Sequence, residues 1–99
     1  ENLTEPLMHV DFEDGETGGR YVLRTEGGAA VSTFSKAGDK IVIIDHTEVD
    51  DALRGRGYGQ MLIEQIVADM RKQSKKIVPL CPFAASQFRK HPEWADVLN

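Results

Sequence analysis

Cysteine and long apolar runs are both scarce in this sequence. A single cysteine among 99 residues excludes an intrachain disulfide and suits a reducing compartment. The longest purely aliphatic run, residues 41–44, is far too short to span a membrane. No signal-peptide pattern is visible either. We therefore expect a cytoplasmic protein with no membrane partner.

Positive charge is also in short supply. Twelve lysines and arginines stand against sixteen aspartates and glutamates, which gives a net charge of −4. This balance argues against a general nucleic-acid binder. Internal repeats, low-complexity segments and linkers are absent, and 99 residues leave no room for a second core. We expect one domain spanning residues 1–99.

Three of the nine glycines alternate with other residues in the stretch Leu-Arg-Gly-Arg-Gly-Tyr-Gly at residues 53–59, between a β-prone run and an amphipathic run. A strand, a glycine-rich turn and a helix together can bind phosphate, because the turn exposes backbone N–H groups and the helix N-terminus adds positive potential. Glycine lets an anion approach the backbone closely, and Arg54 and Arg56 add charges suited to phosphate oxygens. The alternative is an ordinary turn with solvated arginines.

Four β-prone segments precede this loop, at residues 7–12, 20–25, 29–35 and 40–49. The short glycine-containing connections between them predict an antiparallel meander, and residues 1–6 are expected to form a loose tail. Near-continuous apolar character at residues 41–44 predicts burial on both faces, and hence a central strand.

The second half of the chain predicts a helix, a strand and another helix. Residues 58–73 carry one apolar helical face, formed by Tyr58, Met61, Leu62, Ile66, Val67 and Met70. A right-handed crossover would lay residues 76–81 parallel to residues 40–49. Pro79 fits either a point where these two strands splay apart or a bulge or edge position. The expected fold is therefore α/β (α+β), with a mixed sheet of about five strands, a crossover helix and a second helix at residues 82–90.

The loop also carries a family resemblance. Its Arg-x-x-Gly-x-Gly string at residues 54–59 matches the Arg/Gln-x-x-Gly-x-Gly/Ala signature of the GNAT superfamily of N-acetyltransferases. A P-loop would need Lys and Ser or Thr after its last glycine, and a dinucleotide fingerprint needs a different glycine spacing. The sequence resembles in particular the short GNAT-like N-acetyltransferase subfamily. Members of that subfamily carry Asp-His-Thr-Glu-Val before the loop, a later cysteine and a His-Pro-Glu-Trp segment, here residues 45–49, Cys81 and residues 91–94.

This resemblance implies a GNAT-like fold, acetyl-CoA as cosubstrate without a metal, and acetyl transfer to an amine that the resemblance does not identify. It also implies that the loop binds the CoA pyrophosphate and that Val49 offers backbone hydrogen bonds to the pantetheine arm. The expected cofactor-binding residues are thus Val49, Arg54, Gly55, Arg56, Gly57, Tyr58 and Gly59.

Two departures from the superfamily pattern favour a second hypothesis. Residues 13–19 are too short for the helices that help form the acceptor site in most GNAT enzymes, and Phe88 stands near where many place a tyrosine general acid. The alternative function is therefore a non-catalytic CoA or acyl-CoA-binding module that regulates a partner.

Cys81 and His46 are the candidate catalytic residues. Cys81 precedes Pro82, which suits the first position of a helix, and a cysteine at a helix N-terminus favours a thiolate. His46 lies near the C-terminal end of the expected central strand, where ligands bind in α/β sheets. We expect the two to flank the thioester, with Cys81 accepting the acetyl group and His46 shuttling a proton, or with Cys81 protonating the departing CoA thiolate. Structural roles remain open for both residues.

Three acids accompany these candidates. Glu48 shares a strand face with His46 under period-two alternation, so it could act as a base, orient His46 or remain a solvated acid. Asp50 and Asp51 are expected to tether the loop or its arginines, since free acids beside a phosphate site would repel the ligand.

Overall fold

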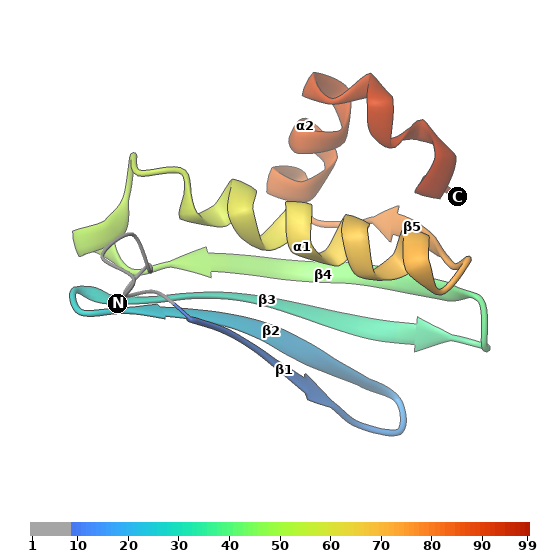
Figure 1. Ribbon diagram of the computed structural model, residues 1–99, viewed down its shortest axis with the longest axis horizontal. Helices are drawn as coiled ribbons and strands as arrows, with labels where there is room; N and C mark the ends of the chain where they lie inside the picture. Colours follow the sequence, from blue (N-terminus) through green and yellow to red (C-terminus); the bar gives the residue numbers. More distant parts are fainter. Residues whose placement is uncertain (1–8) are drawn as a thin grey trace, which may run out of the picture.

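A computed structural model describes residues 9–99, which form one five-stranded sheet with two helices (Figure 1). The elements are β1 (His9–Asp14), β2 (Gly18–Thr25), β3 (Gly28–Ala37), β4 (Ile41–Val49), the 3₁₀ turn η1 (Asp51–Leu53), α1 (Tyr58–Lys72), β5 (Lys76–Pro79), α2 (Pro82–Lys90) and the 3₁₀ turn η2 (Pro92–Val97). The strands are ordered as in the chain. The expected tail and the first two residues of the first expected strand lie outside the described residues.

The strand pairing follows the expected topology. Strands β1 to β4 form an antiparallel meander. Strand β5 then pairs with β4 in the parallel sense, after the chain has crossed over through α1. The mixed sheet expected from the sequence is therefore confirmed.

Helix α1 lies along the sheet and closes the core (Figure 1). Its buried residues are Gly59, Leu62, Ile63, Ile66, Val67 and Met70. All of them except Gly59 belong to one core cluster with Tyr21, Leu23, Phe34 and Ile44 of the sheet. Met61 was expected on this face but is 37% exposed, whereas Ile63 is fully buried. The buried positions centre on the side of Gly59 and Met70, so Met61 lies on the opposite, exposed side of the helix with Glu64, Gln65 and Ala68. Within residues 9–99, neither helix is long and apolar enough to cross a membrane.

One polar contact fixes α1 to the sheet. The Tyr21 hydroxyl donates a hydrogen bond to Asp69 Oδ2 at 2.8 Å, and the tyrosine is 1% exposed. Burial raises the pKa of Tyr21, and the hydrogen bond to the Asp69 carboxylate raises it further. The hydroxyl therefore stays protonated at neutral pH and remains a donor to α1.

Strand β4 contains a bulge that the sequence did not reveal. Phe34 pairs with Ile44 and Thr33 pairs with His46, so Asp45 is an extra residue. Before the bulge, the even-numbered positions Val42 and Ile44 face the core. Beyond it the even-numbered His46 and Glu48 are exposed, and the odd-numbered positions turn inward.

The expected burial of residues 41–44 on both faces is wrong. Val42 and Ile44 are buried, but Ile41 and Ile43 are only half-buried. Helix α1 packs on the face of Val42 and Ile44, so their neighbours on the opposite face keep part of their surface in water.

Strands β4 and β5 part immediately after Ile44. Their last paired residues are Ile44 and Pro79, and β4 then runs on to Val49. The backbone N–H groups of Leu80 and Cys81 both donate to the carbonyl of Ile44, each at 3.1 Å. Pairing ends at Pro79, as a splay of the two strands predicts, and β5 is also the edge strand of the sheet, as the alternative reading predicts.

Replacing Ile44 by alanine tests whether the core depends on this point. Ile44 is fully buried, so Ile44→Ala should lower the free energy of unfolding by about 2–5 kcal/mol in urea denaturation. Leu80→Ala is the control, because Leu80 is 66% exposed and its loss should cost about 0.5 kcal/mol or less. Equal losses in the two variants would contradict this placement of the core.

Candidate functional site

The glycine loop places two glycines in a conformation that other residues rarely adopt. Gly55 and Gly57 have φ angles of 80° and 82°, in the left-handed region. A Cβ atom built on either residue would meet nothing within 4 Å, so both positions face open space. The backbone at these positions is therefore accessible to a ligand.

The same loop leaves the start of α1 uncapped. Gly57 is the N-cap residue and offers no side-chain hydrogen bond, and no acid lies in the first turn. The first backbone hydrogen bond of the helix runs from the Met61 N–H to the Gly57 carbonyl at 3.1 Å. The preceding N–H groups lack intrahelical partners and carry the positive end of the helix dipole. This end of α1 is thus suited to an anion.

Gly59 has a different role from the two loop glycines. A Cβ atom on Gly59 would lie 2.8 Å from the ring of Phe83. The missing side chain therefore lets α2 pack against the first turn of α1. This contact forms one wall of a hollow beside the loop.

That hollow, here called the loop groove, has a volume of about 380 Å³. It lies between the end of β4, the start of α1 and one face of α2. Its lining residues are Val49, Leu53, Arg54, Gly55, Gly57, Tyr58, Gly59, Gln60, Phe83 and Gln87. Every expected cofactor-binding residue except Arg56 lines it. Arg56 borders a separate hollow beside the β2–β3 turn.

The two acids before the loop are held by different partners. Asp51 forms an exposed ion pair with Arg54, with a distance of 3.1 Å from Oδ1 to Nε. Asp50 Oδ2 instead accepts a hydrogen bond from the Ala29 N–H at 2.7 Å. The expected tethering role is therefore confirmed for Asp51 at an arginine, whereas Asp50 ties the loop to β3. Gly28 permits this second contact, because its φ is 149° and a Cβ there would lie 2.6 Å from Asp50 Oδ2.

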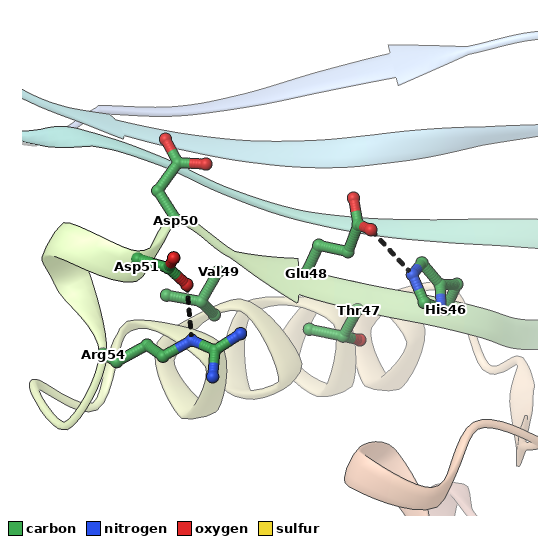
Figure 2. Close-up of a pocket in the computed structure, with 7 residues that line it drawn as sticks. All are labelled: His46, Thr47, Glu48, Val49, Asp50, Asp51 and Arg54. Atoms are coloured by element: carbon green, nitrogen blue, oxygen red, sulfur yellow. Dashed lines mark ion pairs between the residues drawn. The ribbon is translucent and has the colours of Figure 1, made fainter.

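A second hollow, of about 590 Å³, lies at the end of β4 (Figure 2). It is lined by His46, Thr47, Glu48, Val49, Asp50, Asp51 and Arg54. His46 Nε2 lies 3.3 Å from Glu48 Oε2, and both side chains are more than half exposed. Glu48 therefore contacts His46, as their shared strand face predicts. Among residues 9–99, no group of three or more His, Cys, Asp or Glu side chains is placed to hold a metal ion.

Cys81 occupies the N-cap of α2 and is 5% exposed. Its Sγ accepts a hydrogen bond from the Ala84 N–H at 3.3 Å and lies 3.6 Å from Thr47 Oγ1. Thr47 Oγ1 in turn lies 3.0 Å from the hydroxyl of Ser32, which is fully buried. The sulfur therefore stands at the end of a chain of hydroxyl groups that runs through two strands.

The structure does not bring Cys81 and His46 together, although the sequence led us to expect them on either side of one thioester. Thr47, which follows His46, points to the sulfur, and alternation along the strand places His46 on the opposite face. The bulge at Asp45 causes this separation, because without it the even-numbered residues would continue on the core face. Thr47 and Gln87 are the site residues that sequence reasoning missed, since only the bulge and the packing of α2 turn them toward the site.

Comparisons with known proteins agree with this fold. A family model described as GCN5-related N-acetyl-transferase matches residues 20–97. Among solved structures, the chain is similar to the NMR solution structure of a GCN5-like protein from Staphylococcus aureus, with 30% sequence identity and a TM-score of 0.69. That match covers 90% of this chain and 87% of the other. No curated protein matches the sequence.

The hydroxyl chain behind Cys81 can be tested by its effect on stability. Thr47→Val should lower the free energy of unfolding by about 1–3 kcal/mol, because it removes the hydrogen-bond partner of the buried Ser32 hydroxyl. Thr47→Ser keeps the hydroxyl and should cost less. The double variant Ser32→Ala/Thr47→Val should recover part of the loss, since it removes both polar partners. Strictly additive losses in urea denaturation would show that the two hydroxyls do not interact.

Proposed function

The chain belongs to the GCN5-related N-acetyltransferase family, and from this premise we propose that it binds acetyl-CoA in the loop groove and transfers the acetyl group to an amine. The observation that carries the proposal is the uncapped start of α1 behind two left-handed glycines that face open space. This combination offers several N–H donors to one anion without steric hindrance. The start of α1 lies at one end of the loop groove, and α2, whose N-cap is Cys81, forms the opposite wall.

The pyrophosphate fits the loop on electrostatic grounds. The first-turn N–H groups of α1 supply donors, and the Arg54 guanidinium supplies a mobile positive charge beside them. Arg54 is paired with Asp51 at the surface, and such an exposed pair is weak enough to be exchanged for a phosphate. Arg56 borders a neighbouring hollow, from which it can raise the local potential without entering the groove.

The pantetheine arm fits along β4. Beyond Ile44 this strand has lost β5 as its neighbour, so its edge is open toward α2. Val49 lies on this stretch and lines the groove. An extended amide-containing chain can hydrogen-bond to such an edge in the manner of an added strand.

We assign Cys81 to the end of the pantetheine arm that carries the acetyl thioester. Going down the inner face of β4 from Val49, the next inward position is Thr47, which contacts the sulfur. The N–H of Ala84 donates to this sulfur. The Thr47 hydroxyl can donate to the same sulfur, so two donors can point at the atom that acts as nucleophile.

The chemistry then balances over two steps. The thiolate attacks the thioester carbonyl, the carbon–sulfur bond to CoA breaks, and CoA leaves as its thiolate. The amine next attacks the acetyl-cysteine, forms the amide and restores the Cys81 thiolate. The proton that the amine loses goes to solvent, and the departed CoA thiolate takes a proton from solvent, so the products are the acetylated amine and neutral CoA thiol. His46 has no part in these steps, because it lies on the other face of β4.

Two glycines with the same left-handed backbone conformation make it possible to distinguish a loss of ligand binding from the effect of backbone strain. Gly57→Val should weaken CoA binding by about tenfold or more in calorimetry, because its side chain would occupy the space assigned to the phosphate. Gly38→Val is the matched control, since Gly38 also has a left-handed φ, of 75°, and faces open space, but at the β3–β4 turn. The control should lose similar stability and keep its CoA affinity. Normal CoA affinity in a folded Gly57→Val variant would overturn the assignment of the loop.

The role of Cys81 can be read from intact-protein mass spectrometry after incubation with acetyl-CoA. We expect one acetyl adduct on the parent protein, none on Cys81→Ala and an unchanged adduct on His46→Asn. A parallel assay follows free CoA release with a polyamine and with a lysine-containing peptide. Full transfer activity in Cys81→Ala would leave the cysteine a packing role, and CoA binding with no release under any condition would favour a non-catalytic CoA-binding module.

A further inference from the structure

We propose that Gln87 recognises the pantetheine arm by accepting a hydrogen bond from one of its amide N–H groups. This inference rests on the proposed function and names a residue that the loop signature does not include. Gln87 is 5% exposed, and its Oε1 atom has no hydrogen-bond partner among the described residues. An unpaired buried acceptor costs about 1–3 kcal/mol, so proteins seldom keep one without a use.

The position of Gln87 points to a ligand in the loop groove. Gln87 and Phe83 lie one helical turn apart on α2, and both line the groove. Phe83 packs against Gly59 at the first turn of α1, which fixes this face of α2 beside the start of that helix. Gln87 is therefore one of the wall residues of the groove, and its Oε1 atom, which has almost no exposed surface of its own, meets a ligand once the side chain turns outward.

The backbone around Gln87 is held in place. The carbonyl of Gln87 lies 2.8 Å from His91 Nδ1, and His91 stacks on the buried ring of Trp94 with 4.1 Å between the ring centroids. These contacts stabilise the C-terminal end of α2. Gln87 is thus carried by a rigid element, as a recognition group requires.

Only one part of acetyl-CoA combines the right chemistry with the right place. The adenine amino group lies on the far side of the phosphates from the arm. The phosphates carry no N–H donor and are assigned to the glycine loop, and the thioester has no N–H and is assigned to Cys81. The pantetheine arm between them has two amide N–H groups. A ligand amide would satisfy the Gln87 oxygen, whereas an apolar chain in the groove would leave it unpaired and would be disfavoured.

The test compares CoA with its nucleotide part, 3′-phospho-ADP, which lacks the arm. Gln87→Leu keeps the side-chain size and removes the acceptor. It should weaken CoA binding in calorimetry by about three- to tenfold and leave 3′-phospho-ADP binding unchanged. Gln65→Leu is the matched control on the exposed side of α1 and should bind both ligands as the parent does.

Two further readouts separate recognition from a structural role. Because Gln87→Leu removes an unpaired polar atom, its free energy of unfolding should equal or exceed that of the parent. In NMR spectra, the side-chain carboxamide signals of Gln87 should shift on adding CoA and stay in place with 3′-phospho-ADP.

The outcomes distinguish this inference from the function it rests on. Parent protein that binds neither ligand would overturn the proposed function and with it the role of Gln87. Parent protein that binds CoA, together with a Gln87→Leu variant of unchanged affinity, would overturn only the assignment of Gln87. Equal losses for CoA and 3′-phospho-ADP in that variant would also contradict it, because the nucleotide part does not contact the arm site.

Discussion

The carbonyl oxygen of Ile44 marks the point on which the rest of the structure depends. Two N–H groups, from Leu80 and Cys81, converge on it where β5 ends. The extra residue Asp45 follows at once and exchanges the two faces of β4. One position therefore ends the parallel pairing, frees an edge of β4 and turns Thr47 toward the helices. The groove exists because the sheet is interrupted there, and α2 begins in the space that opens.

Electrostatics around the loop depend on local arrangement more than on total charge. The chain has a net charge of −4, yet the acids nearest the loop are engaged by specific partners, Asp50 by the Ala29 N–H and Asp51 by Arg54. The start of α1 has no acid in its first turn. The helix dipole and the unpaired N–H groups are therefore left available to an anion.

Sequence reasoning succeeded where the signal was local. Strand alternation, glycine turns and the apolar face of α1 place the elements, and the crossover rule orients β5. It failed where a partner strand or a packed helix decides the outcome. A bulge depends on how β3 and β4 pair, so no local sequence feature near Asp45 predicted that His46 would face away from Cys81. Gln87 reads as an ordinary polar helix residue until Phe83 is seen against Gly59.

The short β1–β2 connection bears on how two substrates could be handled. Only residues 15–17 separate β1 from β2, so no helix arises there to shape an acceptor pocket. An enzyme that must bind the amine and acetyl-CoA together needs surface for both. An acetyl group held on Cys81 would relax this demand, because CoA could leave before the amine enters. A buried cysteine at the start of α2, connected through Thr47 to Ser32, is consistent with such a division of the reaction in time. In that scheme the outer hollow around His46 and Glu48 is not required for the first step, which depends on the core face of β4 alone.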